Sequence, residues 1–371
     1  MATAAWYELK DPAAIDSPAL LFYKARIASN IDAMVCMAGS ANRLMPHVKT
    51  HKCAEIVKMQ LQAGIRQFKC ATIAEAEMLA DAGAQNILLA YQLTMPKARR
   101  FISLVKKYPA VQFASLADNY LSAQMLNNLC AAANTRARVF IDVDAGMHRT
   151  GIAADDLLFE LYTQIIQLPN TDCLGLHIYD GHVRDADLEL RTQQVQKDFA
   201  GVHTIANKIK EVGYPAPLII AGGTPSFSVH ALDESVICSP GTCVLCDEGY
   251  RVQLPEQPFL PAAVLLTRVA SKPMRGLVTT DLGHKSVAAE NAIDRRIFFL
   301  NLEEYTVRSQ SEEHLVLEVN NWDSIRVGDV LYGVPYHVCP TVALYDEAHV
   351  IVSGDLADHW NIIARKRKLT V

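Results

Sequence analysis

Eight short apolar runs recur along the first two thirds of the chain, and helix-like segments separate them. The segments between the runs, such as IAEAEMLADAG and LSAQMLNNLCAAAN, carry apolar residues at helical spacing. Strands that alternate with helices form parallel sheets. The count of eight, with no G-x-G-x-x-G after the first run, favours a closed (β/α)8 barrel over an open doubly wound sheet. The runs lie at residues 45–50, 67–72, 86–91, 111–118, 137–145, 172–179, 216–223 and 236–245.

The pattern changes near residue 256, after which helical segments nearly vanish. We therefore predict a barrel at residues 24–255 and a β-rich domain at residues 256–371. The early run SPALLFY is predicted to be an extra strand, so that residues 1–23 join the C-terminal β domain. The strand-like runs of that domain read AAVLLTRVAS, GLVTTDLG, IFFLNLEEYTV, HLVLEV, DVLYGVPYH, TVALYD and HVIVSG.

Composition narrows the possible partners. The formal net charge of the 371 residues is −5, and no basic stripe is present, so nucleic acid is not expected to bind. No window approaches 18 uncharged apolar residues, and the N-terminus has no positive segment followed by a long apolar stretch. We expect a protein of the cytoplasm that acts on a small molecule rather than at a membrane.

Residues suited to chemistry follow the predicted strands. Active sites of α/β barrels lie at the C-terminal ends of the strands. The seventh run ends in GGTPSF and the eighth contains SPGT, and glycines with hydroxyl residues at neighbouring strand ends indicate a phosphate cradle of backbone N–H groups. The sixth run carries His177 and Tyr179 ahead of DGH. These features indicate a phosphorylated cofactor.

Lys49 lies at the end of the first run, in PHVKTHK. Strand alternation would place it with His47 and His51 on one face. A lysine that lines a barrel is costly to bury unless it is paired or covalently engaged. An isolated run of this kind is usually a solvated basic loop, but together with the phosphate cradle it indicates a Schiff-base lysine.

His337 and Cys339 form an i, i+2 pair in PYHVCPT. On an extended strand both would point to the same side, a spacing that suits two ligands of one metal ion. Such a pair on its own is more often structural. If it binds a metal, the soft thiolate favours Zn²⁺, with Mn²⁺ possible but less natural.

The ordered set PHVKTHK, DVDAGMHRTGI, AGGTPS, SPGT and PYHVCPT resembles the fold-type III pyridoxal-phosphate enzymes, which have an alanine-racemase-like barrel. Within them it is most similar to the branch of D-threonine aldolases and D-serine dehydratases. The resemblance implies Lys49 as the cofactor lysine, Arg149 beside a cofactor oxygen and Tyr179 facing the pyridine nitrogen. It also implies a divalent metal at the position of His337 and Cys339, and a homodimer. The residues that it assigns to the phosphate are Gly223, Thr224, Gly241 and Thr242.

The resemblance implies a lyase that acts on D-β-hydroxy amino acids, of the D-threonine aldolase type. The metal would lower the pKa of the substrate hydroxyl, and His182 or His177 would take its proton while glycine and an aldehyde form. For each histidine a supporting role is an open alternative. The position of Glu313 and His314 is compatible with the site or with a surface turn.

A second reading is a D-serine dehydratase, in which Lys49 removes the α-proton and pyruvate and ammonia form. Cys339 favours this reading, because the resembling aldolases have His-x-Asp and the dehydratases His-x-Cys. An amino-acid racemase is less favoured, because the catalytic tyrosine motif of racemases is not found. A non-catalytic cofactor carrier is less favoured too, because such proteins lack a second domain.

Overall fold

The computed structural model describes residues 5–371 and divides into two compact units. The barrel unit comprises residues 34–49, 57–241 and 366–371. The β-rich unit comprises the described residues up to 33, together with residues 50–56 and 242–365. These units follow packing, whereas the limits 1–23, 24–255 and 256–371 follow the sequence pattern and remain our proposed domain boundaries.

The barrel unit is built on one parallel sheet with the order β2-β3-β4-β5-β7-β8-β9, and the short β6 pairs with β5. Residues 44–48 close the ring: Leu44 bridges Cys238 of β9, and His47 bridges Lys69 of β2. The predicted barrel with eight positions is confirmed. Its strands are β2 (Gln67–Cys70), β3 (Asn86–Gln92), β4 (Gln112–Ala117), β5 (Ala137–Asp144), β6 (Ile152–Ala153), β7 (Thr171–Ile178), β8 (Leu218–Ala221) and β9 (Val236–Cys238).

The first position of the ring differs from the prediction. Residues 44–48 make only isolated bridges, in which Met45 N donates to Cys238 O at 2.8 Å and Val48 N donates to Lys69 O at 2.9 Å. Residues 48–51 then form a turn, so His47, Lys49 and His51 do not share one face of a strand. The last predicted run is also shorter, because Thr242–Val244 forms a 3₁₀ turn.

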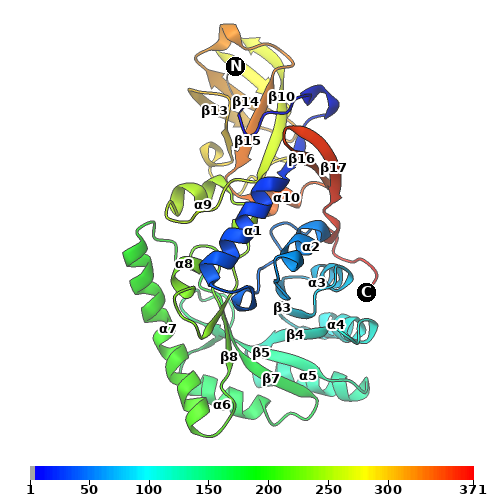
Figure 1. Ribbon diagram of the computed structural model, residues 1–371, viewed down its shortest axis with the longest axis vertical. Coiled ribbons are helices and arrows are strands. Elements are labelled where there is room, and N and C mark those ends of the chain that lie inside the picture. The colour runs from blue at the N-terminus through cyan, green and yellow to red at the C-terminus, as the bar shows by residue number, and fades with distance from the viewer. Residues whose placement is uncertain (1–4) are drawn as a thin grey trace. The chain divides into compact units, whose positions relative to one another are not determined.

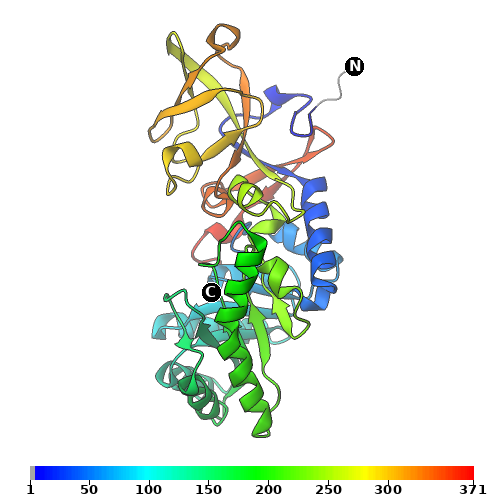
Figure 2. The same ribbon diagram turned by 90° about the vertical axis from the view of Figure 1, so that its left-hand side faces the viewer.

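Helices follow the barrel strands on the outside of the ring (Figure 1), and Figure 2 shows the long helix α7 along its full length. Polar side chains begin them: Asn119 accepts from Ser122 N at the start of α5, and Asp187 accepts from Glu189 N and Leu190 N at the start of α7. The helices of the chain are α1 (Lys24–Ala38), α2 (Ala54–Gln62), α3 (Ile73–Asp81), α4 (Met95–Lys107), α5 (Tyr120–Ala132), α6 (Asp156–Ile165), α7 (Leu188–Glu211), α8 (Phe227–His230), α9 (Glu248–Gln253) and α10 (Val338–Val342).

Apolar side chains from several strands form one core cluster of the barrel unit: Met45, Leu88, Ala114, Leu116, Phe140 and Ile220. Full burial of a leucine or phenylalanine side chain stabilises a fold by about 1.5–3 kcal/mol. This cluster fixes the strands whose C-terminal ends carry the polar residues of interest.

The β-rich unit contains one mixed sheet with the order β13-β14-β11-β10-β1-β16-β17, in which β15 pairs with β10 and β12. The N-terminal strand β1 runs antiparallel to β10 and parallel to β16, which confirms that it joins the C-terminal sheet. The strands are β1 (Ala19–Tyr23), β10 (Ala263–Met274), β11 (Leu277–Thr280), β12 (Ile297–Phe299), β13 (Tyr305–Gln310), β14 (Leu315–Val319), β15 (Val330–Pro335), β16 (Glu347–Val352) and β17 (Asp355–Asn361).

In this unit one predicted strand was wrong and one strand was missed. The run TVALYD was expected to be a strand, but its first residues end α10, where Pro340 falls in the first turn and so removes no intrahelical hydrogen bond. Strand β17 was missed because it is an edge strand whose outward residues are mostly charged or polar, so its alternation is weak. Among the described residues, no helix has the length and apolar character to cross a membrane.

Candidate active site

The ring of Tyr179, directly after β7, lies among three cationic side chains of the barrel unit. The Nζ of Lys49 is 5.4 Å from the ring centroid, the Nζ of Lys69 is 5.7 Å away and the guanidinium carbon of Arg149 is 4.9 Å away. Each cation is attracted to the ring face, but the three repel one another. The cluster therefore suits an anionic ligand.

Lys69 was not singled out from the sequence. It lies in β2 and is only 2% exposed. Burial, together with the nearby charge of Lys49, lowers the pKa of Lys69 to about 7. A charged residue between the buried Phe68 and Cys70 in QFKCAT was the available signal, because the burial argument applied to Lys49 holds for it equally.

His177 links Lys69 to a buried carboxylate. Lys69 Nζ lies 3.5 Å from His177 Nε2, and His177 Nδ1 pairs with Asp142 Oδ1 at 2.7 Å. Gln92 donates to the other oxygen of Asp142 at 2.6 Å. Burial lowers the pKa of His177. The pKa of Asp142 is also lowered: burial alone would raise it, but the hydrogen bond with His177 helps to lower it. With both ring nitrogens engaged, His177 is placed to orient Lys69.

His182 has a different environment. It is exposed, and its Nε2 lies 3.0 Å from Asp198 Oδ2, while Gln194 donates to Asp198 Oδ1 at 2.7 Å. A Cβ atom on Gly146 would lie 3.1 Å from His182 Nε2, so the loop after β5 comes close to the imidazole. His182 is thus held through one ring nitrogen by a carboxylate on α7.

The glycine-rich loops after β8 and β9 meet. Gly241 N donates to Thr224 Oγ1 at 3.4 Å, and Gly223 N donates to Ser226 Oγ at 3.3 Å. A Cβ atom on Gly223 would lie 3.1 Å from the ring of Tyr179. The structure therefore brings Gly223, Thr224 and Gly241 together near Tyr179, and Thr242 is the next residue in the chain, at the start of the segment that belongs to the β-rich unit.

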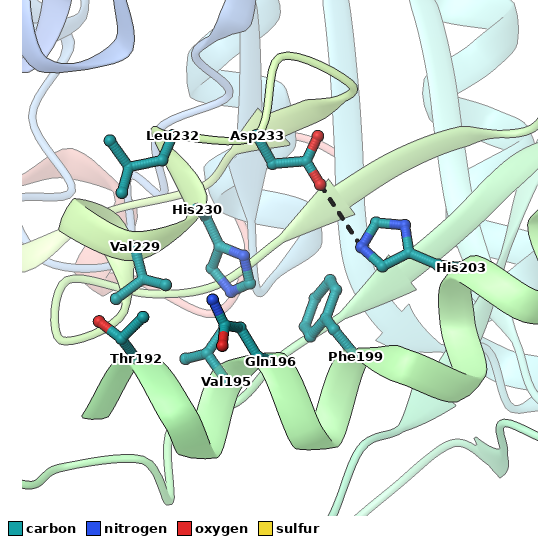
Figure 3. A pocket seen from close by; sticks show the side chains of 9 residues that line it. All are labelled: Thr192, Val195, Gln196, Phe199, His203, Val229, His230, Leu232 and Asp233. Atoms are coloured by element: carbon teal, nitrogen blue, oxygen red, sulfur yellow. Dashed lines mark ion pairs between the residues drawn. The ribbon is translucent and has the colours of Figure 1, made fainter. Parts of the chain in front are cut away.

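The buried residues Asp180 and His230 stabilise the loop after β8. Asp180 accepts from Ser226 Oγ at 2.7 Å and pairs with His230 Nε2 at 2.7 Å. Burial alone would raise the pKa of Asp180, but the hydrogen bond with His230 helps to lower it. His230 also lines a cavity of about 310 Å³ between α7 and the segment around α8. Figure 3 shows its imidazole on the same side of α7 as Phe199. The hydrogen bonds of Asp180 to Ser226 and His230 therefore hold this loop in place.

These residues fit pyridoxal phosphate. Lys49 supplies an amine, and the cations near Tyr179 suit a phosphate and a phenolate oxygen. Glycine at position 181 lets Tyr179 pack directly on the backbone, because a Cβ atom on Gly181 would lie 2.4 Å from the hydroxyl of Tyr179. The barrel unit therefore offers the amine and the positive charge that this cofactor needs.

The predicted metal pair lies in the β-rich unit, with a different local structure from the one predicted. His337 is the residue before α10 and Cys339 lies in the first turn of that helix, so the two are not on an extended strand. Their side chains nevertheless hydrogen-bond to each other. Cys339 Sγ also lies 3.2 Å from Thr50 Oγ1 and 3.4 Å from Thr242 Oγ1.

Two carboxylates near His337 were missed by sequence reasoning. Glu290 Oε1 lies 2.5 Å from His337 Nδ1, and the buried Asp247 accepts from Val338 N at 3.1 Å. Burial opposes protonation of His337, but Cys339, Asp247 and Glu290 raise its pKa to about 9. Desolvation raises the pKa of Asp247 to about 6.

This donor set fits zinc. An imidazole that donates Nδ1–H to a carboxylate offers Nε2 to a metal, and the neighbouring thiolate is a preferred zinc ligand. Glu313 and His314 are exposed in the turn before β14, where Glu313 pairs with Lys285 at 3.3 Å. That geometry agrees with a surface turn.

Comparison with known proteins identifies the family. Residues 23–248 match the family described as "Alanine racemase, N-terminal domain". The chain belongs to this family. Residues 262–351 of this alanine-racemase-like chain match a second family, described as "Putative serine dehydratase domain".

Three relatives illustrate the similarity. A D-threonine aldolase of Arthrobacter sp is 29% identical, with 96% of this chain and 94% of that protein covered. A D-threo-3-hydroxyaspartate dehydratase of Delftia sp. strain HT23 is 22% identical, with 93% and 97% covered. The crystal structure of a D-threonine aldolase from Filomicrobium marinum superposes with a TM-score of 0.88 at 23% identity, over 95% of this chain and 96% of that one. The predicted membership of the fold-type III pyridoxal-phosphate enzymes is confirmed.

Proposed function

We propose that the chain is a pyridoxal-phosphate- and divalent-metal-dependent lyase that cleaves D-β-hydroxy amino acids to glycine and an aldehyde. The observation that carries this proposal is the cluster of Lys49, Lys69 and Arg149 around Tyr179, next to the glycine-rich loops. The full-length similarity to a D-threonine aldolase supports the choice of reaction.

Within this proposal, Lys49 would hold the cofactor through its side-chain amine, and Arg149 and Tyr179 would flank it. Gly223, Thr224, Gly241 and Thr242 would hold the phosphate. When bound, pyridoxal phosphate supplies an electron sink for the pair released as the Cα–Cβ bond breaks. Lys69 is held by His177, which pairs with Asp142. Because its pKa is about 7, Lys69 would gain or lose its positive charge near the cofactor at close to neutral pH.

His182 is the better candidate for the base. It is exposed and keeps one ring nitrogen outside its contact with Asp198, which would leave that nitrogen for a substrate hydroxyl. His177 has both ring nitrogens engaged and is buried. We therefore propose that His182 takes the proton and that His177 positions Lys69.

His337 and Cys339 would hold the metal, with Glu290 fixing the imidazole. A bound divalent ion supplies a Lewis acid, which lowers the pKa of a hydroxyl group and favours its ionisation. Zn²⁺ is the preferred ion and Mn²⁺ the alternative, because the set includes a thiolate.

A dehydratase is the second candidate, with D-serine as the substrate and pyruvate and ammonia as products. Cys339 favours it, as does the similarity to the Delftia dehydratase. In that reaction Lys49 would remove the α-proton instead of only holding the cofactor.

One assay separates the two candidates. The purified protein is incubated with D-threonine and with D-serine, with and without chelator, and acetaldehyde, glycine and pyruvate are measured. An aldolase gives equal amounts of acetaldehyde and glycine from D-threonine, with L-threonine as the control. Pyruvate from D-serine without glycine from D-threonine would replace the aldolase by the dehydratase, and no product under any condition would reject both.

We also propose a homodimer in the cytoplasm that takes a small D-amino acid as its substrate and binds neither nucleic acid nor a membrane. Sedimentation equilibrium of the cofactor-loaded protein tests the dimer, and a monomer with full activity would contradict it.

A further inference from the structure

The last two strands of the β-rich sheet form a hairpin with a polar outer face. β16 and β17 are antiparallel, and Ala348 and Trp360, which are partners in the ladder, point inward and are buried. Because side chains alternate along a strand, the neighbouring residues point outward. Glu347, His349 and His359 therefore share the outer face.

His349 and His359 are direct partners across this ladder. Ile362 N donates to Asp346 O at 2.8 Å, so residues 346 and 362 form a hydrogen-bonded pair. Pairs alternate along an antiparallel ladder, which makes 349 and 359 one of the closer pairs that exchange no backbone hydrogen bonds. The two imidazole centroids are 4.8 Å apart, with the rings inclined by 69°.

A third ligand lies beside them. Glu347 is two residues before His349 on the same strand, and one ligand atom from each of the three side chains lies within 4.8 Å of the other two. Ligands of a tetrahedral zinc ion are about 3.4 Å apart, given bonds of about 2.1 Å. Small side-chain rotations would therefore close the set around one ion.

One ring nitrogen of His349 lacks a hydrogen bond within the described part of the chain. Its Nδ1 is buried and has no hydrogen-bond partner among the described residues. Buried polar atoms in folded proteins are nearly always satisfied, and an exception calls for an explanation such as a bound ion. This observation is independent of the spacing of the three side chains.

We propose that Glu347, His349 and His359 form a second metal site, which binds a zinc-type divalent transition ion. Two imidazoles and one carboxylate suit Zn²⁺ better than Mg²⁺ or Ca²⁺, and water completes the fourth position. The ion ties β16 to β17 at the edge of the sheet. The site shares no ligand with the His337–Cys339 pair and does not rest on the proposed function.

Zinc stoichiometry tests this site in the cofactor-loaded protein. Metal is removed with a chelator, and Zn²⁺ is added back in competition with a chromophoric chelator. We expect two ions per chain for the unchanged protein, one for Cys339→Ala, one for His349→Gln/His359→Gln and none for the triple variant. Loss of one ligand should weaken the hairpin site by at least about tenfold, since even changes behind metal ligands cost about 10–100-fold.

Matched variants make the test decisive. Glu347→Gln and His359→Gln change exposed residues on the hairpin, and His314→Gln removes an exposed histidine elsewhere in the β-rich unit. Zn²⁺ should raise the unfolding temperature of Cys339→Ala, and should not do so once His359→Gln is added. Unchanged stoichiometry in both His359→Gln and Glu347→Gln, or an equal loss in His314→Gln, would overturn the site. If the unchanged protein binds a single ion that only the hairpin variants lose, the hairpin site stands and the metal role of Cys339 fails.

Discussion

The cluster around Tyr179 and the pair at His337 and Cys339 are built in opposite ways. The first joins side chains from several strand ends of the barrel unit, and its supporting residues, such as His177, are buried. The second comes from neighbouring residues at the start of one short helix, and the His337 side chain is 45% exposed. A site assembled by the whole fold should hold its ligand firmly, whereas a local and exposed pair should exchange its ligand readily.

The largest effect should come from Lys49→Ala. Because the cofactor carries the chemistry, loss of its attachment should abolish the yellow colour and lower activity by at least about a thousandfold. Absorption spectra and borohydride fixation followed by peptide mapping measure this. Label on Lys69 instead of Lys49 would reverse the roles of the two lysines.

Cys339→Ala tests the proposed metal site at His337 and Cys339. Loss of a Lewis acid at an ionising oxygen is worth several kcal/mol, so turnover should fall by roughly a thousandfold while the yellow colour remains. Chelation should do the same and be reversible. Cys339→Asp should keep activity and shift its preference from Zn²⁺ toward Mn²⁺. If metal removal also released the cofactor, the two sites would not be independent.

The two histidines of the barrel unit should respond differently. His182→Gln should lower kcat by about a hundredfold or more, as expected for a lost base. His177→Gln should mainly lower the unfolding temperature, because it leaves Asp142 and Lys69 buried without their shared partner. The reverse pattern in kcat and unfolding temperature would exchange their proposed roles.

The smallest effect concerns Lys69 in the cofactor-free protein. Its pKa is about 7 in the folded protein and 10.5 ordinarily, so the unfolded chain binds more protons between these values. The contribution of Lys69 to stability therefore rises with pH across this window, and the cost of the buried charge is greatest below pH 7. Lys69→Met should raise the unfolding temperature more at pH 6 than at pH 9. The exposed Lys106→Met serves as control, and equal shifts at both pH values would contradict the lowered pKa.

Much of the barrel could be predicted because its signals are local. Strand and helix periodicity marks each element, and the glycine-rich loops after β8 and β9 lie at strand ends in the sequence as in the structure. Lys49 was found because it lies in a conspicuously basic segment. Lys69 was missed because a single lysine inside a short apolar run does not disturb the period of the pattern.

The two carboxylates near the candidate metal pair could not be predicted from the spacing of residues in the sequence. Glu290 is 47 residues from His337 and Asp247 is 91 residues from Val338, and such contacts depend on how the sheet folds. The turn at residues 48–51 and the helix α10 were also misread, because a few mixed residues satisfy both an extended and a helical pattern.

The division into two units has a consequence for recombination of this protein with its relatives. The chain passes from one unit to the other after residues 33, 49, 56, 241 and 365. Two of these junctions are the peptide bonds Lys49–Thr50 and Gly241–Thr242, and both threonine hydroxyls contact Cys339 Sγ. A chimera that exchanged one unit would need a new junction at each crossing, including one directly beside the proposed cofactor lysine. Substrate preference should therefore be transferred by replacing single side chains, because the two units cannot be exchanged as modules.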